Sequence, residues 1–222
     1  MKVIAHRGAS IAERENTLEA FRAAVRLGAD MVELDARRAA DGAIVVHHDA
    51  LLGDGAAIVE LPSQDLPPWI PLLRDALLAC APLDVNVEVK NIPGEPDFDP
   101  DESVIASVAR LVAQGDYPDV LISSFHPPTV NKARELGLAS ALLVHPLVDQ
   151  AEGLNAAITG GHDAWHPYFA VITAELVDRA HDEGLRVNVW TCDDPDWIRR
   201  LRDWGVDGVC TNAPDLARAA LA

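Results

Sequence analysis

The sequence is poor in cysteine, and the few cysteines it has are widely separated. Only three occur among 222 residues, Cys80, Cys192 and Cys210, and no two of them form a C-x-x-C pair. An odd number of scattered cysteines indicates buried free thiols rather than a disulfide framework. Free thiols in turn suggest a reducing compartment.

Basic residues are also scarce relative to acidic ones. The chain has 18 lysines and arginines against 35 aspartates and glutamates, which gives a formal net charge of −17. Such a surface repels nucleic-acid phosphates and anionic membranes. We therefore expect neither nucleic acid nor a stable membrane association, and an anionic substrate would need local positive charge at its site. The oligomeric state is not indicated.

Long hydrophobic runs are missing. The amino terminus, MKVIAHRG, has one lysine and then only three apolar residues before a His-Arg pair, too short for a signal-peptide core. No run of about 18 apolar residues suggests a membrane span. These absences lead us to expect a cytoplasmic protein. With 49% hydrophobic residues and no linker rich in Gly or Ser, residues 1–222 are expected to form a single domain around one core.

Short apolar runs alternate with longer amphipathic stretches. Strands are expected at Lys2–Ala5, Met31–Asp35, Asp84–Val89, Val120–Ser123, Ser140–Val144, Ala164–His166, Arg186–Trp190 and Gly208–Thr211. Helices are expected at Thr17–Leu27, Leu72–Cys80, Glu102–Gln114, Pro128–Leu136, Ala151–Thr159, Ala174–Glu183, Pro195–Trp204 and Pro214–Leu221. Eight alternating pairs predict an α/β fold, the (β/α)8 TIM barrel. An open doubly wound sheet is the alternative, because periodicity does not reveal closure.

One further strand, Ile44–His48, interrupts the alternation. It begins only nine residues after Asp35, whereas a parallel crossover needs a dozen or more. Asp41-Gly42 is typical of a hairpin turn. We therefore predict a β-hairpin extension after the second strand, which returns the chain to the carboxyl-terminal face of the barrel. This return would bring His48 to the site, while alternation sends His47 to the opposite face.

Charged side chains end the first three barrel strands. They are His6 and Arg7, then Glu33 and Asp35, and finally Glu88 and Lys90. Residues two apart share a face of a strand, so three carboxylates should converge inside the barrel. Each pair alone has a structural explanation, such as a salt bridge or a core histidine. Three such pairs on one rim favour a functional site, and a hard divalent cation with oxygen ligands would relieve the repulsion.

Other polar residues are interpreted structurally or left unassigned. Asn16, with Glu19 three residues on, suggests a helix N-cap in a capping box. The remaining histidines lack carboxylate neighbours at metal-ligand spacing and receive no role: His126, His145, His162, His166 and His181.

Together these residues resemble the glycerophosphodiester phosphodiesterase family over nearly the whole chain. The matching pieces are His6-Arg7-Gly8, Glu15-Asn16-Thr17, Gly28-Ala29-Asp30, Glu33-Leu34-Asp35, Asp41-Gly42, His48-Asp49, Ile70-Pro71-Leu72, Glu88-Val89-Lys90, Ser123-Ser124-Phe125, Val189-Trp190-Thr191 and Val206-Asp207-Gly208 with Thr211. The ordered set is highly specific, although no single piece is. The resemblance implies a barrel that hydrolyses glycerophosphodiesters to glycerol 3-phosphate and an alcohol.

The resemblance also implies roles for individual residues. It implies one divalent cation, Mg²⁺ or Ca²⁺ with Mn²⁺ as a further option, at Glu33, Asp35 and Glu88. It implies His6 and His48 as an acid/base pair. It implies substrate binding by Arg7, Lys90 and Trp190. Arg7 would bind the phosphate, Lys90 would be a second phosphate or metal-site contact, and the tryptophan would lie against the glycerol.

The chain departs from the family pattern at several places, which leaves the alcohol open. Arg14 replaces a common Pro, Asn212 replaces a common Asp, and an Arg-Thr-Thr stretch is missing after Asp49. We expect the acidic loop Pro93–Asp101 to favour a cationic alcohol. One alternative function is a lysophospholipase D with an apolar funnel from the loop Leu61–Leu73. The other is a non-catalytic binding barrel.

Overall fold

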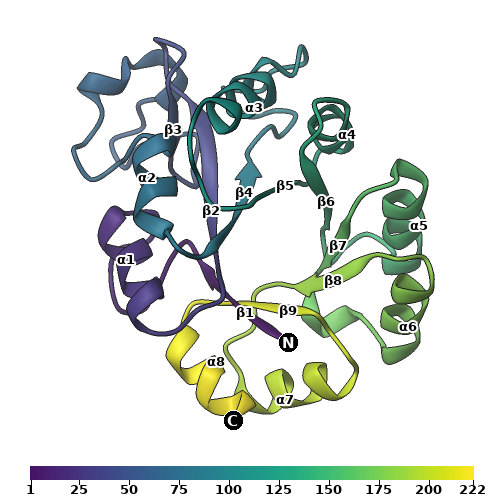
Figure 1. Ribbon diagram of the computed structural model, residues 1–222. Coiled ribbons are helices and arrows are strands. Elements are labelled where there is room, and N and C mark those ends of the chain that lie inside the picture. The colour runs from purple at the N-terminus through teal and green to yellow at the C-terminus, as the bar shows by residue number, and fades with distance from the viewer.

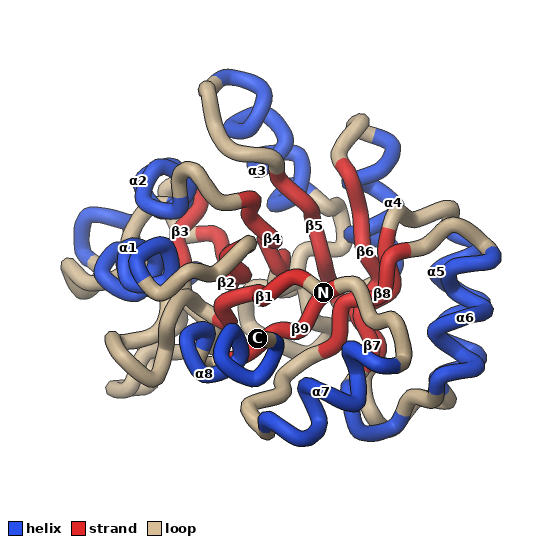
Figure 2. Tube along the Cα trace, turned by 60° about the horizontal axis from the view of Figure 1, so that its bottom comes forward, coloured by secondary structure: helices blue, strands red, loops and turns tan.

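The computed structural model describes residues 1–222 and contains a closed barrel of parallel strands surrounded by helices (Figures 1 and 2). The barrel strands are β1 (Lys2–His6), β2 (Met31–Arg38), β4 (Asp84–Val89), β5 (Val120–Ser124), β6 (Ala139–Val144), β7 (Ala164–Pro167), β8 (Arg186–Val189) and β9 (Gly208–Thr211). Strand β1 pairs with both β2 and β9, which closes the ring. Closure confirms the predicted TIM barrel and excludes the open sheet.

One helix follows each barrel strand, directly or after the hairpin. The helices are α1 (Leu18–Arg26), α2 (Leu73–Cys80), α3 (Ser103–Gln114), α4 (Pro127–Glu135), α5 (Gln150–Gly160), α6 (Ala174–Asp182), α7 (Pro195–Asp203) and α8 (Pro214–Leu221). All eight expected helices are present, and no end is shifted by more than one residue. None combines the length and the apolar character that crossing a bilayer requires.

The predicted hairpin is also confirmed. Strand β3 (Ile44–Val46) pairs antiparallel with the distal half of β2, so that Ala36 lies opposite Val46. The turn between them contains Gly42 at a φ of 82°, a left-handed conformation that glycine adopts without strain. The segment then runs back toward the barrel rim, and the His47 amide donates to the Asp35 carbonyl at 3.0 Å.

Alternation along β2 separates the two faces of the barrel wall. Val32, Leu34 and Ala36 point outward into the apolar layer beneath α1 and α2. Glu33 and Asp35 therefore point inward, toward the barrel axis. A second apolar layer covers the β6 to β9 half of the barrel. The three cysteines are free and buried, as predicted.

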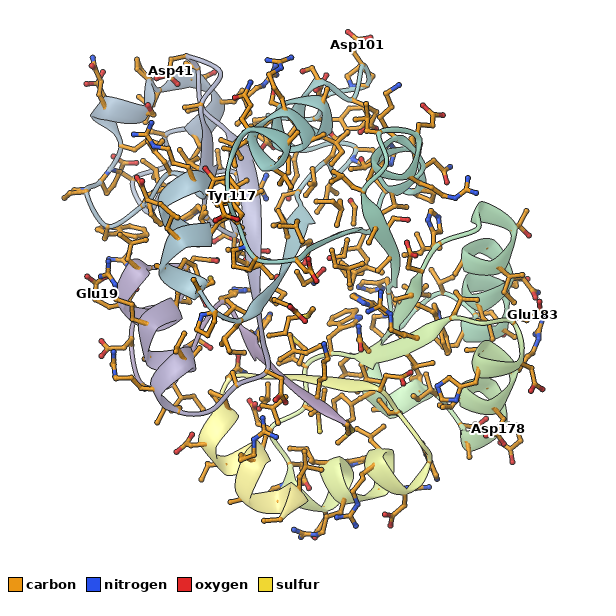
Figure 3. All side chains as sticks on the ribbon, in the orientation of Figure 1. Glu19, Asp41, Asp101, Tyr117, Asp178 and Glu183 are labelled. Carbon is orange, nitrogen blue, oxygen red and sulfur yellow. The ribbon has the colours of Figure 1, made fainter.

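Small clusters of apolar side chains fill the barrel interior below the rim. Ile4, Met31 and Cys210 form one such group, and Leu121 packs with two alanines in another. Between the hairpin and α2, the 3₁₀ turns Ile58–Glu60 and Ser63–Asp65 lie over a separate small core, and a third 3₁₀ turn spans Phe169–Val171. Figure 3 shows acidic side chains such as Glu19, Asp178 and Glu183 on the outer surface, away from the barrel axis.

Candidate active site

A cavity of about 130 Å³ lies at the carboxyl ends of the barrel strands. Seven of the eight predicted site residues line it: His6, Arg7, Glu33, His48, Glu88, Lys90 and Trp190. The eighth, Asp35, is buried beside it with one oxygen 3.3 Å from Arg7 Nε and the other 3.7 Å from Lys90 Nζ. The fold therefore brings the whole predicted set together.

Three carboxylates meet at the base of this cavity. Glu33, Asp35 and Glu88 each place one oxygen so that the three atoms lie within 4.8 Å of one another. Asp35 lies directly opposite Glu88 in the β2–β4 register. One Glu33 oxygen, Oε1, is buried without a hydrogen-bond partner. Oxygen atoms in this arrangement suit a hard divalent cation, and the unpartnered oxygen is a free ligand atom.

Burial and mutual repulsion control the charge of these carboxylates. Burial, together with Asp35 and Glu88, raises the pKa of Glu33 well above its usual value. Burial also raises the pKa of Glu88, against the opposing effect of Lys90. Asp35 differs: burial alone would raise its pKa, but Lys90 and Arg7 outweigh that effect and lower it. A bound cation would offset the repulsion that the protein's own groups leave uncompensated.

The two predicted catalytic histidines have different hydrogen-bond partners. His6 Nδ1 lies 2.7 Å from the Asn212 amide oxygen, whereas His48 Nδ1 lies 2.7 Å from the Asp49 carboxylate. Burial is the main cause of a lowered pKa for both rings, and Arg7 contributes to each. A neutral partner on one ring and an anionic partner on the other distinguish the two histidines chemically.

His47 is outside this cavity. Its ring packs against Trp69 with the centroids 5.5 Å apart, and its Nδ1 lies 2.9 Å from the Asp49 carbonyl oxygen. Strand alternation predicted that only one of the two adjacent histidines would face the site, and the structure confirms the expected orientation.

The turn after β1 positions Arg7 through its backbone. Arg7 has a φ of 56°, and its amide donates to Glu33 Oε2 at 3.0 Å while its guanidinium donates to Glu15. The following Gly8 has a φ of 81°, and a Cβ added there would lie 2.6 Å from the Ala20 backbone. Only glycine fits this contact with α1, which explains the His-Arg-Gly sequence.

Asn16 corrects one prediction from the sequence. It is not the N-cap of α1: Thr17 is, because its hydroxyl accepts from the Ala20 amide at 3.2 Å. Asn16 is buried with a φ of 57°, donates to Asp35 Oδ2 at 2.8 Å and accepts from the Asp35 amide. It therefore orients a carboxylate of the candidate metal site, and the capping box with Glu19 does not exist.

The opposite wall of the cavity is aromatic. Trp190 donates through Nε1 to the His166 carbonyl at 2.9 Å and packs edge-on against Phe125 and Tyr168. His166, left unassigned from the sequence, also lines the cavity, where Asn188 donates to its Nε2 at 3.0 Å. Burial lowers the pKa of His166 to about 3, so this ring is neutral. Only the position of His166 near the carboxyl end of β7, two residues before Tyr168, could have suggested from the sequence that it lines the site.

The acidic loop after β4 is not the free anionic surface that the sequence suggested. Glu95 and Asp97 both bind the buried guanidinium of Arg37, at 2.9 and 2.7 Å. Asp99 accepts from the Ser103 amide at the start of α3. Of the four acidic residues in this loop, only Asp101 is fully exposed without an ion pair, and Figure 3 shows it pointing outward. The loop therefore offers fewer free carboxylates than expected, and the preference for a cationic alcohol stays a prediction.

The loop Leu61–Leu73 presents less apolar surface than a funnel for an acyl chain would need. Ile58, Leu66 and Ile70 turn inward and form their own small core. The Trp69 ring is covered by the guanidinium of Arg14, whose central carbon lies 3.1 Å from the ring centroid. A cation over the ring leaves less apolar surface for an acyl chain.

Comparisons with known proteins agree with this geometry. The model of the glycerophosphoryl diester phosphodiesterase family matches residues 6–216. A glycerophosphodiester phosphodiesterase from Caldanaerobacter subterraneus is 26% identical, with 96% of this chain and 94% of that protein covered.

Solved structures share the fold. A phosphodiesterase from Oleispira antarctica, in complex with the product sn-glycerol-3-phosphate, is 24% identical with a TM-score of 0.88, covering 100% of this chain and 96% of that one. A glycerophosphodiester phosphodiesterase from Thermotoga maritima is 24% identical with a TM-score of 0.85, covering 100% and 98%. With the family match over residues 6–216, the chain belongs to the glycerophosphoryl diester phosphodiesterase family and is a phosphoric diester hydrolase.

Proposed function

We propose that this protein hydrolyses glycerophosphodiesters to glycerol 3-phosphate and an alcohol, using one divalent cation and two histidines. The observation that carries the proposal is the meeting of three carboxylates within 4.8 Å in a cavity that His6 and His48 also line. The product bound to the Oleispira antarctica relative supports the same substrate class. Residues 1–222 would act as one catalytic unit.

Glu33, Asp35 and Glu88 would hold the cation, with Mg²⁺, Ca²⁺ and Mn²⁺ as the candidates. When bound, the cation would polarise a phosphoryl oxygen and neutralise negative charge. Arg7 and Lys90 are the cationic side chains that line the cavity of this acidic protein, so they would bind the phosphate. Lys90 also donates to Glu88 at 2.7 Å, which ties the phosphate contact to a metal ligand.

His6 is assigned as the base and His48 as the acid. The ring partner of His6 is a neutral amide oxygen, which holds Nδ1–H and leaves Nε2 with a free lone pair. The partner of His48 is the Asp49 carboxylate, which stabilises a protonated ring. Direct attack by water and prior attack by the glycerol 2-hydroxyl both require a base on the nucleophile. In either case the acid protonates the departing alkoxide oxygen.

Trp190 would form the wall for the glycerol moiety. Its ring is fixed by the hydrogen bond to the His166 carbonyl and by the edge contacts of Phe125 and Tyr168. A rigid aromatic surface can pack against the carbon backbone of glycerol while the hydroxyls face polar groups.

A substrate panel tests the proposal. Glycerophosphocholine, glycerophosphoethanolamine, glycerophosphoinositol and lysophosphatidylcholine should be assayed with and without EDTA, with glycerol 3-phosphate and lysophosphatidate measured separately. We expect glycerol 3-phosphate from the water-soluble diesters, loss of turnover with EDTA, and recovery with added cation. Release of lysophosphatidate alone would instead support the lysophospholipase D alternative. Activity that persists in metal-stripped protein would contradict the metal assignment.

A further inference from the structure

Two hydrogen bonds link Asp193, at the protein surface, to the ring of His6. Asn212 donates through Nδ2 to Asp193 Oδ2 at 2.6 Å, and the Asn212 oxygen Oδ1 lies 2.7 Å from His6 Nδ1. Asp193 and Asn212 follow β8 and β9, and His6 is the last residue of β1. These three strands are neighbours in the barrel. This chain of two hydrogen bonds, called the relay below, therefore runs along the rim, outside the carboxylate cluster.

Asp193 fixes which way the Asn212 amide faces. An ionised carboxylate only accepts hydrogen bonds, so the amide nitrogen must face Asp193 and the amide oxygen must face His6. Asp193 Oδ1 is anchored by two more donors, the Asn212 backbone amide and the Thr211 hydroxyl, both at 2.7 Å. A flipped amide would place two acceptor oxygens 2.6 Å apart.

The orientation of the amide in turn fixes the tautomer of His6. An amide oxygen only accepts, so Nδ1 must carry the proton and Nε2 must have the lone pair. Ser10 donates to the same Asn212 oxygen at 3.1 Å, which agrees with an acceptor there. Nε2 has no competing acceptor at hydrogen-bond distance, since its nearest carboxylate oxygen, Glu33 Oε2, is 4.0 Å away.

We propose that Asp193 and Asn212 are positioning residues that lock His6 in the Nδ1–H tautomer, so that Nε2 faces the cavity as a proton acceptor. The inference rests on the proposed role of His6 as the base. Neither residue touches the substrate in this scheme: Asp193 acts through Asn212, and Asn212 acts through the histidine ring.

An exchange of the two side chains tests the lock. In Asp193→Asn the amide of Asn212 is free to turn, so the fraction of His6 in the active tautomer falls, and we expect kcat to fall about 10- to 100-fold with little change in KM. Asn212→Asp keeps an acceptor opposite His6 Nδ1 but sets it beside the Asp193 carboxylate. Repulsion between the two carboxylates moves that acceptor away from the ring, and we expect a similar loss. The double variant Asp193→Asn with Asn212→Asp restores one donor and one acceptor between the positions. We expect its kcat to return to within about threefold of the wild type, a difference of about 0.65 kcal/mol in the activation barrier at about 1.36 kcal/mol per tenfold.

Asp194→Asn is the matched control. It changes the same charge at the next position, but Asp194 caps α7 by accepting from the amides of Asp196 and Trp197, and asparagine caps equally well. We expect wild-type kcat and stability. The relay would be overturned if Asp193→Asn changed kcat no more than Asp194→Asn does. It would also be overturned if the double variant were no more active than either single variant.

A direct measurement separates the lock from the proposed function. Nitrogen-15 NMR of the histidine rings in Mg²⁺-loaded protein at pH 8 distinguishes Nδ1–H from Nε2–H. We expect His6 in the Nδ1–H form in the wild type and a mixture in Asp193→Asn. If the tautomer shifts but kcat does not, the lock stands and the base is another group. If the tautomer of Asp193→Asn is that of the wild type, the lock itself is wrong.

Discussion

Replacing Arg37 with methionine should destabilise the protein strongly and disturb His48. The Arg37 side chain is 1% exposed, and its Nε and Nη2 donate to the His48 carbonyl at 2.8 and 2.6 Å. Its Nη1 binds Asp97 at 2.7 Å and Glu95 at 2.9 Å. One side chain therefore joins the returning hairpin to the loop after β4, and its loss removes contacts from both.

The magnitude follows from the burial of the partner. Asp97 is only 6% exposed, so the variant leaves a carboxylate buried without a cation. Removing one member of a buried ion pair costs about 3–5 kcal/mol, against a total stability of about 5–15 kcal/mol. At about 2–4 °C per kcal/mol for a protein of this size, Tm should fall by about 6–20 °C. We expect kcat to fall as well, because the His48 backbone loses its donors.

Urea unfolding followed by circular dichroism measures the loss, provided that the m-value is unchanged. Arg38→Met is the control, because the neighbouring Arg38 has a single hydrogen bond, 3.2 Å to the Ser103 hydroxyl, and should lose less than about 1 kcal/mol. The double variant Arg37→Met with Asp97→Leu removes both charges and should recover part of the stability. Equal losses in Arg37→Met and Arg38→Met would refute the ion-pair reasoning.

Three further predictions concern the site. His48→Ala should lower the rate about 10²–10⁴-fold, while His47→Ala stays near the wild type in steady-state kinetics. Asn16→Ala should weaken cation binding about 10- to 100-fold by calorimetry, whereas Thr17→Ala should cost about 1 kcal/mol of helix-cap stability and leave cation affinity unchanged. Because Asp101 is exposed and its charge is screened by solvent, Asp101→Asn should alter kcat/KM for cationic and anionic diesters by less than about threefold at any salt concentration.

Each of these has a clear contrary result. Equal losses at the two histidines would mean that the hairpin register is wrong. Unchanged cation affinity in Asn16→Ala would reduce that residue to a structural role. A large, salt-sensitive change of substrate preference in Asp101→Asn would show that the loop takes part in substrate selection.

Much of the barrel was predictable because its signals are local. Alternating apolar residues define strands and three-to-four-residue spacing defines helices, and both patterns are read within a short window. The length of one connection added information about tertiary structure. The segment between Asp35 and Ile44 is too short for a parallel crossover, and this predicted the hairpin and the approach of His48 to the site. The carboxylate cluster followed because parallel strands end at one rim, where Glu33, Asp35 and Glu88 must converge.

The partners of individual side chains were not predictable in the same way. Asparagine is a residue type that often caps helices, so the sequence alone suggests that role for Asn16. Only its left-handed backbone turns the side chain away from α1 and toward Asp35. The four acidic residues after β4 look like a free anionic loop until Arg37 contacts two of them, 58 and 60 residues away in the sequence.

What the sequence determined by itself is the order of strands and helices, the hairpin and the rim on which charged groups gather, because these depend on short-range periodicity and connection length. What only the tertiary structure decided is which of those groups are paired. His6 and Asn212 are 206 residues apart and meet because β1 closes the barrel against β9. The orientation of the His6 imidazole therefore depends on closure of the barrel, and no local pattern encodes that contact.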